Sequence, residues 1–282
     1  MSTSREDLSR ACVPLQAGRD GRWSRRALLA GLGLGAAGLI LPGPRHAGAQ
    51  ETKGPWRVAD VVDGDTLTLD DGREVRLVGL MAPKLSLGRA RVPTEPLAEE
   101  SKAALAALAL GQPVTLWFGG AREDRYGRHL AHLHLDAGRW VQGEMLRHGW
   151  ARVYSFADNR ARVAEMLALE AAARAARRGI WRLNAYRVLG VDDLADRAGT
   201  YQIVEGKVQA ADEARGRTYL NFGADWRRDF TVSIAAADRR RFAGQAPLSL
   251  SGKTVRVRGW VGSRNGPEIV VTHPEQIELL ES

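Results

Sequence analysis

The chain has 282 residues, of which 44% are hydrophobic and 26% are charged. This ordinary globular composition argues against a wholly disordered chain, a fibrous repeat and a polytopic membrane protein. The length suggests one large domain or two of ordinary size. Lysine and arginine outnumber aspartate and glutamate by 41 to 33, which gives a formal net charge of +8. Such a charge is compatible with an acidic partner but does not require one.

Residues 1–49 have the pattern of an export signal. They hold seven arginines and three acidic residues and so contribute half of the excess positive charge. The pair Arg25-Arg26 precedes a short apolar stretch over 27–41 and a small-residue cleavage pattern, as in a twin-arginine signal. An apolar helix of that length reaches about 22 Å, short of the ~30 Å hydrocarbon core of a bilayer. We expect a periplasmic or secreted product without stable membrane insertion, with an uncleaved anchor as the alternative. The only cysteine, Cys12, would be removed with this segment.

The elements expected after the signal alternate between short strands and helices. Strands are expected at 58–69, 74–80, 113–118 and 129–135, and helices at 97–110, 141–148 and 162–178. This order is typical of an OB-type β-barrel with packed helices. We assign residues 50–182 to this domain.

The remaining chain has a different character. Residues 183–198 lack a clear period and read as a linker, and 199–282 is predicted to be a second small all-β, OB-like barrel. Its strands are expected at 201–208, 218–222, 229–234, 254–261 and 268–272. Aromatic and basic residues alternate near Tyr219 and Trp226. They could stack on the bases of single-stranded nucleic acid, or they could form a core beside a solvated turn.

Four motifs of the first domain carry chemistry. Asp63 and Asp65 are two residues apart on a strand and share a face, so both can address one hard cation. Arg76 lies in an otherwise apolar strand, where its charge is costly unless its guanidinium meets an anion. The motif Asp124-Arg-Tyr-Gly-Arg128 and the helix end at 149–153 follow.

The order and spacing of these motifs, from about Trp56 to Trp181, resemble the thermonuclease, or staphylococcal-nuclease-like, family. Residues 62–66 match the D-G-D-T signature of that family, and residues 124–128 match its D-x-Y-G-R signature. The resemblance implies an OB-fold and a calcium-dependent phosphodiesterase that acts on DNA and RNA. Each motif alone is weak, whereas the full series is specific for the fold.

The resemblance also assigns roles to single residues. Arg76 and Arg128 would hold the scissile phosphate, because planar guanidinium groups match its oxygens and the charge of the transition state. Asp65 would be a calcium ligand with Asp63 beside it. Tyr126 would line the nucleotide pocket.

Two positions depart from the family pattern. Met81 stands where a second calcium-ligating aspartate is expected, and Lys84 stands where the general-base glutamate is expected. A thioether is a poor calcium ligand, and a protonated lysine cannot take a proton from water. A positioned general base contributes roughly 10²–10⁴ in rate, so we expect weak, altered or absent nuclease activity.

The sequence therefore predicts an exported protein that binds nucleic acid or another phosphodiester, with a doubtful calcium site. One alternative is an active secreted nuclease, in which Lys84 acts as a metal-free base or phosphate clamp, or in which Glu95, Glu99 or Glu100 supplies the base. Another is a non-catalytic envelope scaffold, in which the arginines only form internal ion pairs.

Overall fold

A computed structural model describes residues 51–88 and 93–280. The predicted export signal lies outside the described residues. All of the described residues fall within one compact unit, residues 47–282. Within those ranges, no helix has the length and apolar character needed to cross a membrane.

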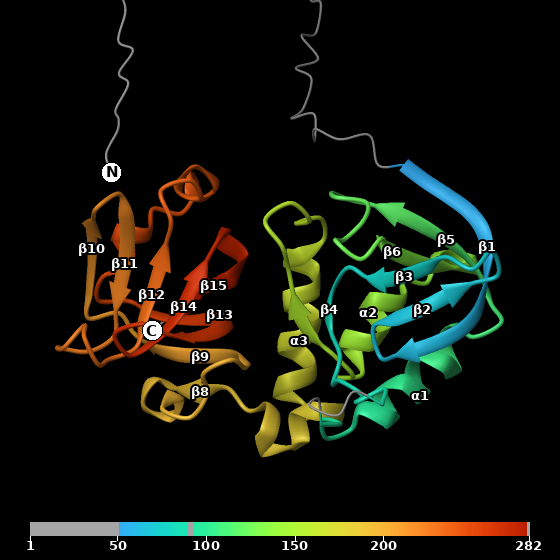
Figure 1. Cartoon of the computed structure of the whole chain (residues 1–282), viewed down its shortest axis with the longest axis horizontal. Coiled ribbons are helices and arrows are strands. Elements are labelled where there is room, and N and C mark those ends of the chain that lie inside the picture. Colours follow the sequence, from blue (N-terminus) through green and yellow to red (C-terminus); the bar gives the residue numbers. More distant parts are fainter. Residues whose placement is uncertain (1–50, 89–92, 281–282) are drawn as a thin grey trace, which may run out of the picture. The chain divides into compact units, whose positions relative to one another are not determined.

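Five strands of the N-terminal half close into a barrel in the order β1-β2-β3-β6-β5, drawn in blue and green in Figure 1. They are β1 (Glu51–Asp63), β2 (Thr66–Leu69), β3 (Glu74–Leu77), β5 (Pro113–Phe118) and β6 (His129–Leu135). Neighbouring strands are antiparallel except β3 and β6, which are parallel. Alternate apolar side chains of these strands form the barrel core, which confirms the predicted OB-type barrel.

Three helices and a short strand pair pack on the barrel. The helices are α1 (Ala98–Ala109), α2 (Val141–Arg147) and α3 (Val163–Ala175), and the antiparallel pair is β4 (Gly79–Met81) with β7 (Arg152–Tyr154). Each helix was expected from the sequence. Strand β4 was expected to continue β3, but the backbone turns at its first residue, which has a φ of 83°, a conformation that favours glycine.

The C-terminal half is an all-β region, as predicted. Its strands form one eight-stranded sheet in the order β10-β11-β12-β14-β13-β9-β8, with β15 paired to β13. The strands are β8 (Leu189–Gly190), β9 (Tyr201–Lys207), β10 (Ala210–Ala214), β11 (Arg217–Asn221), β12 (Thr231–Ile234), β13 (Thr254–Ser263), β14 (Pro267–Val271) and β15 (Ile277–Leu279). Strand β10 was missed because its side chains are half-buried or exposed and show no apolar alternation.

Residues 183–198, which were predicted to be a linker, contain regular structure. It contains 3₁₀ turns at Asn184–Tyr186 and Val191–Leu194, and β8 pairs with β9 in parallel. Leu194 is buried in the core of the C-terminal sheet. This segment is therefore packed against the sheet.

Buried polar contacts join the barrel to the C-terminal sheet. Arg258 on β13 and Glu170 on α3 are 1% and 0% exposed, and Arg258 Nη1 lies 2.9 Å from Glu170 Oε2. The hydroxyl of Tyr201 on β9 donates to the carbonyl of Val153 on β7 at 2.9 Å. Strands β9 and β13 are thereby held against β7 and α3.

A buried histidine on β6 should make stability sensitive to acid. His132 lies between Trp117 and Trp140, and its Nδ1 accepts a hydrogen bond from Trp140 Nε1 at 3.2 Å. Burial, followed by the nearby charge of Arg162, lowers its pKa to about 3. Because the folded-state pKa is below the unfolded value, the contribution of neutral His132 to stability is fully present above pH 6.5. It is lost as the pH drops from 6.5 toward 3.

When the pH is lowered from 7 to 4.5, we expect protonation of His132 to reduce the free energy of unfolding by about 2–3 kcal/mol, at ~1.36 kcal/mol per pH unit below 6.5. The variant His132→Asn keeps an acceptor for Trp140 but does not titrate. Urea unfolding at both pH values should show a smaller acid loss for the variant than for the parent. Equal losses would contradict the assignment.

Candidate functional site

The turn between β1 and β2 presents the two aspartates of the D-G-D-T motif. Asp65 is completely buried, and its backbone N–H donates to Asp63 Oδ1 at 3.0 Å. Helix α1 and the segment after β4 pack directly on this turn, since a Cβ on Gly64 would overlap Ser101 Oγ and lie 2.7 Å from the Cβ of Ala82. Only glycine fits there, so the close packing fixes where the Asp65 carboxylate points.

The Asp65 carboxylate is surrounded by donors. Lys84 Nζ lies 2.9 Å from Oδ1 and 2.8 Å from Oδ2, and Arg76 Nη1 forms an ion pair with Oδ1. The backbone N–H of Ala82 donates to Oδ2 at 2.7 Å, and Thr66 Oγ1 donates to Oδ1 at 3.2 Å. Both oxygens are therefore engaged by this chain's own groups.

The surroundings of Lys84 lower the pKa of its ammonium group. Burial, with repulsion from Arg76 as the second cause, lowers its pKa to about 8. The ammonium is still largely protonated at pH 7, and it also lies 3.5 Å from Asp63 Oδ2. The two aspartates thus share one internal cation.

Arg76 projects from β3 at the edge of the barrel. Besides its ion pair with Asp65, its Nη2 donates to the carbonyl of Leu80 at 2.8 Å. Burial lowers its pKa to about 10, and the charge of Asp63 opposes that shift. The sequence-based expectation that this guanidinium meets an anion is met by a carboxylate of the chain itself.

Arg128 is positioned by the turn that precedes β6. Its Nε and Nη2 lie 2.8 Å and 2.7 Å from Asp124 Oδ2. Asp124 Oδ1 also accepts the backbone N–H groups of Tyr126 and Arg128, at 2.9 Å and 3.1 Å. Partial burial raises the pKa of Asp124, but these hydrogen bonds outweigh it and hold the pKa below its usual value. The turn therefore presents Arg128 in a fixed orientation.

Tyr126 is 67% exposed in this turn. Its hydroxyl accepts a hydrogen bond from Arg125 Nη2 at 2.7 Å, and the guanidinium carbons of Arg125 and Arg128 lie 4.8 Å and 5.5 Å from its ring centre. The ring is accessible for contact with a ligand beside Arg128.

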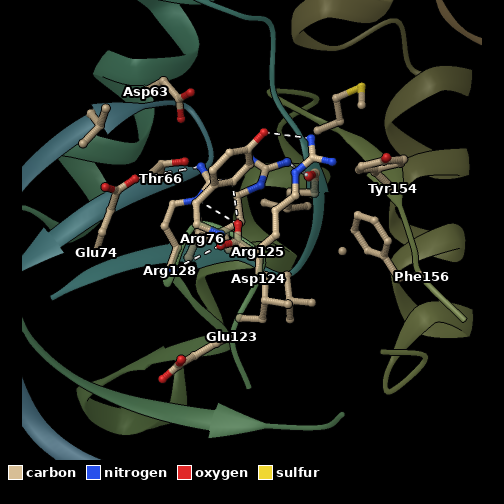
Figure 2. A pocket seen from close by; sticks show the side chains of 18 of the residues that line it. Asp63, Thr66, Glu74, Arg76, Glu123, Asp124, Arg125, Arg128, Tyr154 and Phe156 are labelled. Atoms are coloured by element: carbon tan, nitrogen blue, oxygen red, sulfur yellow. Dashed lines mark hydrogen bonds and ion pairs between the residues drawn. The ribbon is translucent and has the colours of Figure 1, made fainter. Parts of the chain in front are cut away.

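Most of the predicted site residues line one cavity of about 1030 Å³. Its wall includes Arg76, Arg128, Lys84, Asp63 and Tyr126. Figure 2 shows the two arginines near the middle of this cavity, with Tyr154 and Phe156 along one side and Glu74 on the other. Asp65 is absent from the wall because it lies buried behind Lys84 and Arg76.

Comparison with known proteins agrees with this geometry. The family model for staphylococcal nuclease homologues matches residues 74–183. Residues 74–183 are therefore similar to the staphylococcal nuclease family. An uncharacterized protein of Bacillus anthracis is 30% identical over 144 residues, which cover 49% of this chain and 65% of that protein. Endonuclease YhcR of Bacillus subtilis is 26% identical over 205 residues, which cover 68% of this chain and 16% of that protein. The chain thus spans less than two thirds of either relative.

Similarity to the staphylococcal nuclease family makes calcium a candidate cofactor, but the residues present do not fit it. Calcium binds six to eight oxygen ligands, whereas the ammonium of Lys84 occupies both oxygens of Asp65. Met81, which the resemblance places at the second ligand position, is buried, and Arg152 Nη2 lies 3.6 Å from its sulfur. In the part of the chain that the structure describes, no three His, Cys, Asp or Glu residues gather in a way that could hold a metal.

The acidic residues considered as replacement bases lie elsewhere. Glu95 Oε2 accepts the backbone N–H of Lys84 at 3.0 Å, and Glu95 is not part of the cavity wall. Glu99 and Glu100 are exposed on α1 and do not line the cavity either. As positioned, none of the three can take a proton from a water molecule in the cavity.

Sequence reasoning missed several residues of the wall. Tyr154 ends β7 and Phe156 comes two residues later, and Trp260 comes from β13 of the C-terminal sheet. Trp260 stands out in the sequence only as a bulky aromatic beside a glycine in an alternating strand. The pattern could indicate an exposed position but not the cavity that it faces.

Proposed function

We propose that the chain binds nucleic acid, or another phosphodiester, through Arg76 and Arg128, and that it hydrolyses this ligand weakly or not at all. The observation that carries the proposal is the convergence of both guanidinium groups on one cavity. The ammonium of Lys84 lies where the family's chemistry requires a metal. Binding in this arrangement does not depend on calcium.

Arg128 leaves room for a phosphate. Arg128 uses Nε and Nη2 for Asp124, while its Nη1 lies 3.9 Å from Glu74, beyond hydrogen-bond distance. Charge-assisted hydrogen bonds from guanidinium to phosphate are stronger than neutral ones. A phosphate can therefore be added to Arg128 without breaking its contact with Asp124.

Weak hydrolysis follows from the same groups. A general base must accept a proton, and Lys84 at pH 7 is largely protonated. The carboxylates of Asp63 and Asp65 are paired with that ammonium, and Glu95 Oε2 accepts the backbone N–H of Lys84. The position where the resemblance places the general base therefore holds a donor, and the other carboxylates of the wall, those of Glu74, Glu123, Asp124 and Asp158, come from other positions.

A scaffold without phosphate binding is supported by one observation. Both arginines are paired with acids of the chain, Arg76 with the buried Asp65 and Arg128 with Asp124. In that case the ion pairs stabilise the barrel edge, and the cavity has no phosphodiester ligand. Binding measurements separate the two functions.

Fluorescence polarisation with a labelled single-stranded oligonucleotide at low salt tests the proposal. We expect the same affinity in calcium and in EDTA, and a loss of affinity as salt increases. Arg128→Gln should weaken binding by about 10-fold or more, because charged hydrogen bonds are lost. It should also reduce the slope of log K against log salt by about 0.7.

A matched control is Arg147→Gln, which removes the same charge from an exposed helix position outside the cavity. Its affinity should stay close to that of the parent. The proposal fails if the oligonucleotide does not bind at low salt, if binding is independent of salt, or if it requires calcium. Rapid calcium-dependent cleavage by the parent would establish the active nuclease instead.

A further inference from the structure

An exposed tryptophan of the C-terminal sheet faces the cavity of the barrel. Trp260 is 51% exposed and pairs in register with Tyr201 on β9. Val255, Val257 and Val261 of the same strand are buried in the core of the sheet. The Trp260 ring is therefore not needed to fill that core.

Trp260 belongs to two cavities. The first is the 1030 Å³ cavity that holds the arginines, and the second has a volume of about 330 Å³ and includes Val270 and Glu268 in its wall. Three aromatic residues, Tyr154, Phe156 and Trp260, line both. The two cavities are thus neighbours along one aromatic border, which we call the aromatic ridge.

The ridge is fixed in orientation. Trp260 Nε1 lies 3.1 Å from the hydroxyl oxygen of Tyr154, to which it donates. The ring centres of Tyr154 and Phe156 are 4.6 Å apart. The ring centre of Tyr201 lies 6.1 Å from that of Trp260 and 5.1 Å from that of Tyr154, and all three pairs are edge to face. Phe156 is 39% exposed. A ligand would therefore meet preorganised ring surfaces and would not have to order them.

We propose that the aromatic ridge stacks on unpaired bases of a single-stranded nucleic acid whose phosphate lies at Arg76 and Arg128. This inference rests on the proposed function. An aromatic surface alone would suit many apolar partners, but here it borders a cavity whose wall holds three guanidinium groups and an ammonium beside five carboxylates. A single strand carries both matching groups, a phosphodiester beside a flat base.

Duplex nucleic acid fits this arrangement less well. Its bases are already stacked on one another, and only their edges are accessible in the grooves. An oligonucleotide without bases offers the phosphates but nothing for the ridge. We therefore expect the highest affinity for a single strand and a lower affinity for a duplex or an abasic strand.

Binding measured in EDTA with three labelled probes tests this inference: a single-stranded oligonucleotide, its duplex, and an abasic strand of equal length. Stacking of one base on an aromatic side chain accounts for about a 5- to 100-fold gain in affinity. We expect Trp260→Ala to lose that factor on the base-bearing strand only. Trp260→Phe should retain most of the affinity, because it keeps a ring.

Trp226→Ala is the matched control. Trp226 is 49% exposed in the same half of the chain but lines neither cavity, so its replacement should leave all three affinities unchanged. The inference is overturned if the parent binds the abasic strand or the duplex as tightly as the base-bearing strand. It is also overturned if Trp260→Ala weakens all probes equally or none. If the parent binds no probe at all, the proposed phosphate binding fails first.

Discussion

A variant that carries both Met81→Asp and Lys84→Glu is expected to cleave single-stranded DNA about 10²- to 10⁴-fold faster than the parent when calcium is present. This is the factor that a positioned general base typically contributes. Lys84→Glu removes the ammonium from the Asp65 oxygens and supplies a carboxylate at the family's base position. Initial rates on a labelled oligonucleotide, with calcium and with EDTA, measure the effect.

The Lys84 change should account for more of the gain than the Met81 change. Arg152 Nη2 contacts the sulfur of Met81, and Arg152 Nη1 donates to the carbonyl of Tyr201 at 2.9 Å. A carboxylate at position 81 would meet this guanidinium, and part of its charge would be neutralised there. We therefore expect Met81→Asp alone to leave cleavage near the parent's rate.

Lys84→Met is the control for the double variant. It removes the same ammonium but supplies no base, so cleavage should not increase. A gain as large as that of the double variant would show that the ammonium only blocks an existing base. If the parent already cleaves as fast as the double variant in a calcium-dependent way, the impaired-enzyme proposal is wrong.

The barrel could be predicted because its evidence is local. Alternation along β5 and β6, and the glycine after α1, follow from residues close in sequence. The motifs around Arg76 and Arg128 correctly indicated two guanidinium groups in one cavity. For the strands and the helix, the signal and the structure that it specifies lie within a few residues, whereas Arg76 and Arg128 are brought together by the barrel.

The rest depends on contacts between distant segments. The resemblance led us to expect Lys84 in place of the base and a cation at the metal site, but not that its ammonium contacts both oxygens of Asp65, because this contact requires the fold that packs position 84 against position 65. Likewise, Trp226 and its neighbouring arginines were considered for base stacking, yet Trp226 lies outside the cavity and Trp260 lines it. The sequence pattern of a strand identifies an exposed aromatic side chain but not the cavity that this side chain lines.

Replacement of Arg258 by methionine is expected to lower the free energy of unfolding by about 3–5 kcal/mol, since it leaves a buried carboxylate without its main partner. Glu170 is wholly buried and also accepts the backbone N–H of Val153 at 2.7 Å. Burial opposes ionisation of Arg258, but the charges of Glu170 and Glu278 outweigh burial and raise its pKa. Arg174 Nη1, at 3.3 Å from Glu170 Oε2, should keep the loss near the lower end of the range.

The double variant Arg258→Met with Glu170→Gln should recover much of this loss, because glutamine keeps an acceptor for Val153 and carries no charge. Urea unfolding at pH 7 measures all three proteins. The exposed pair Arg187 and Asp193 gives the comparison, since Arg187→Met should cost less than ~1 kcal/mol. If Arg258→Met costs no more than Arg187→Met, the buried pair does not hold the sheet to the barrel.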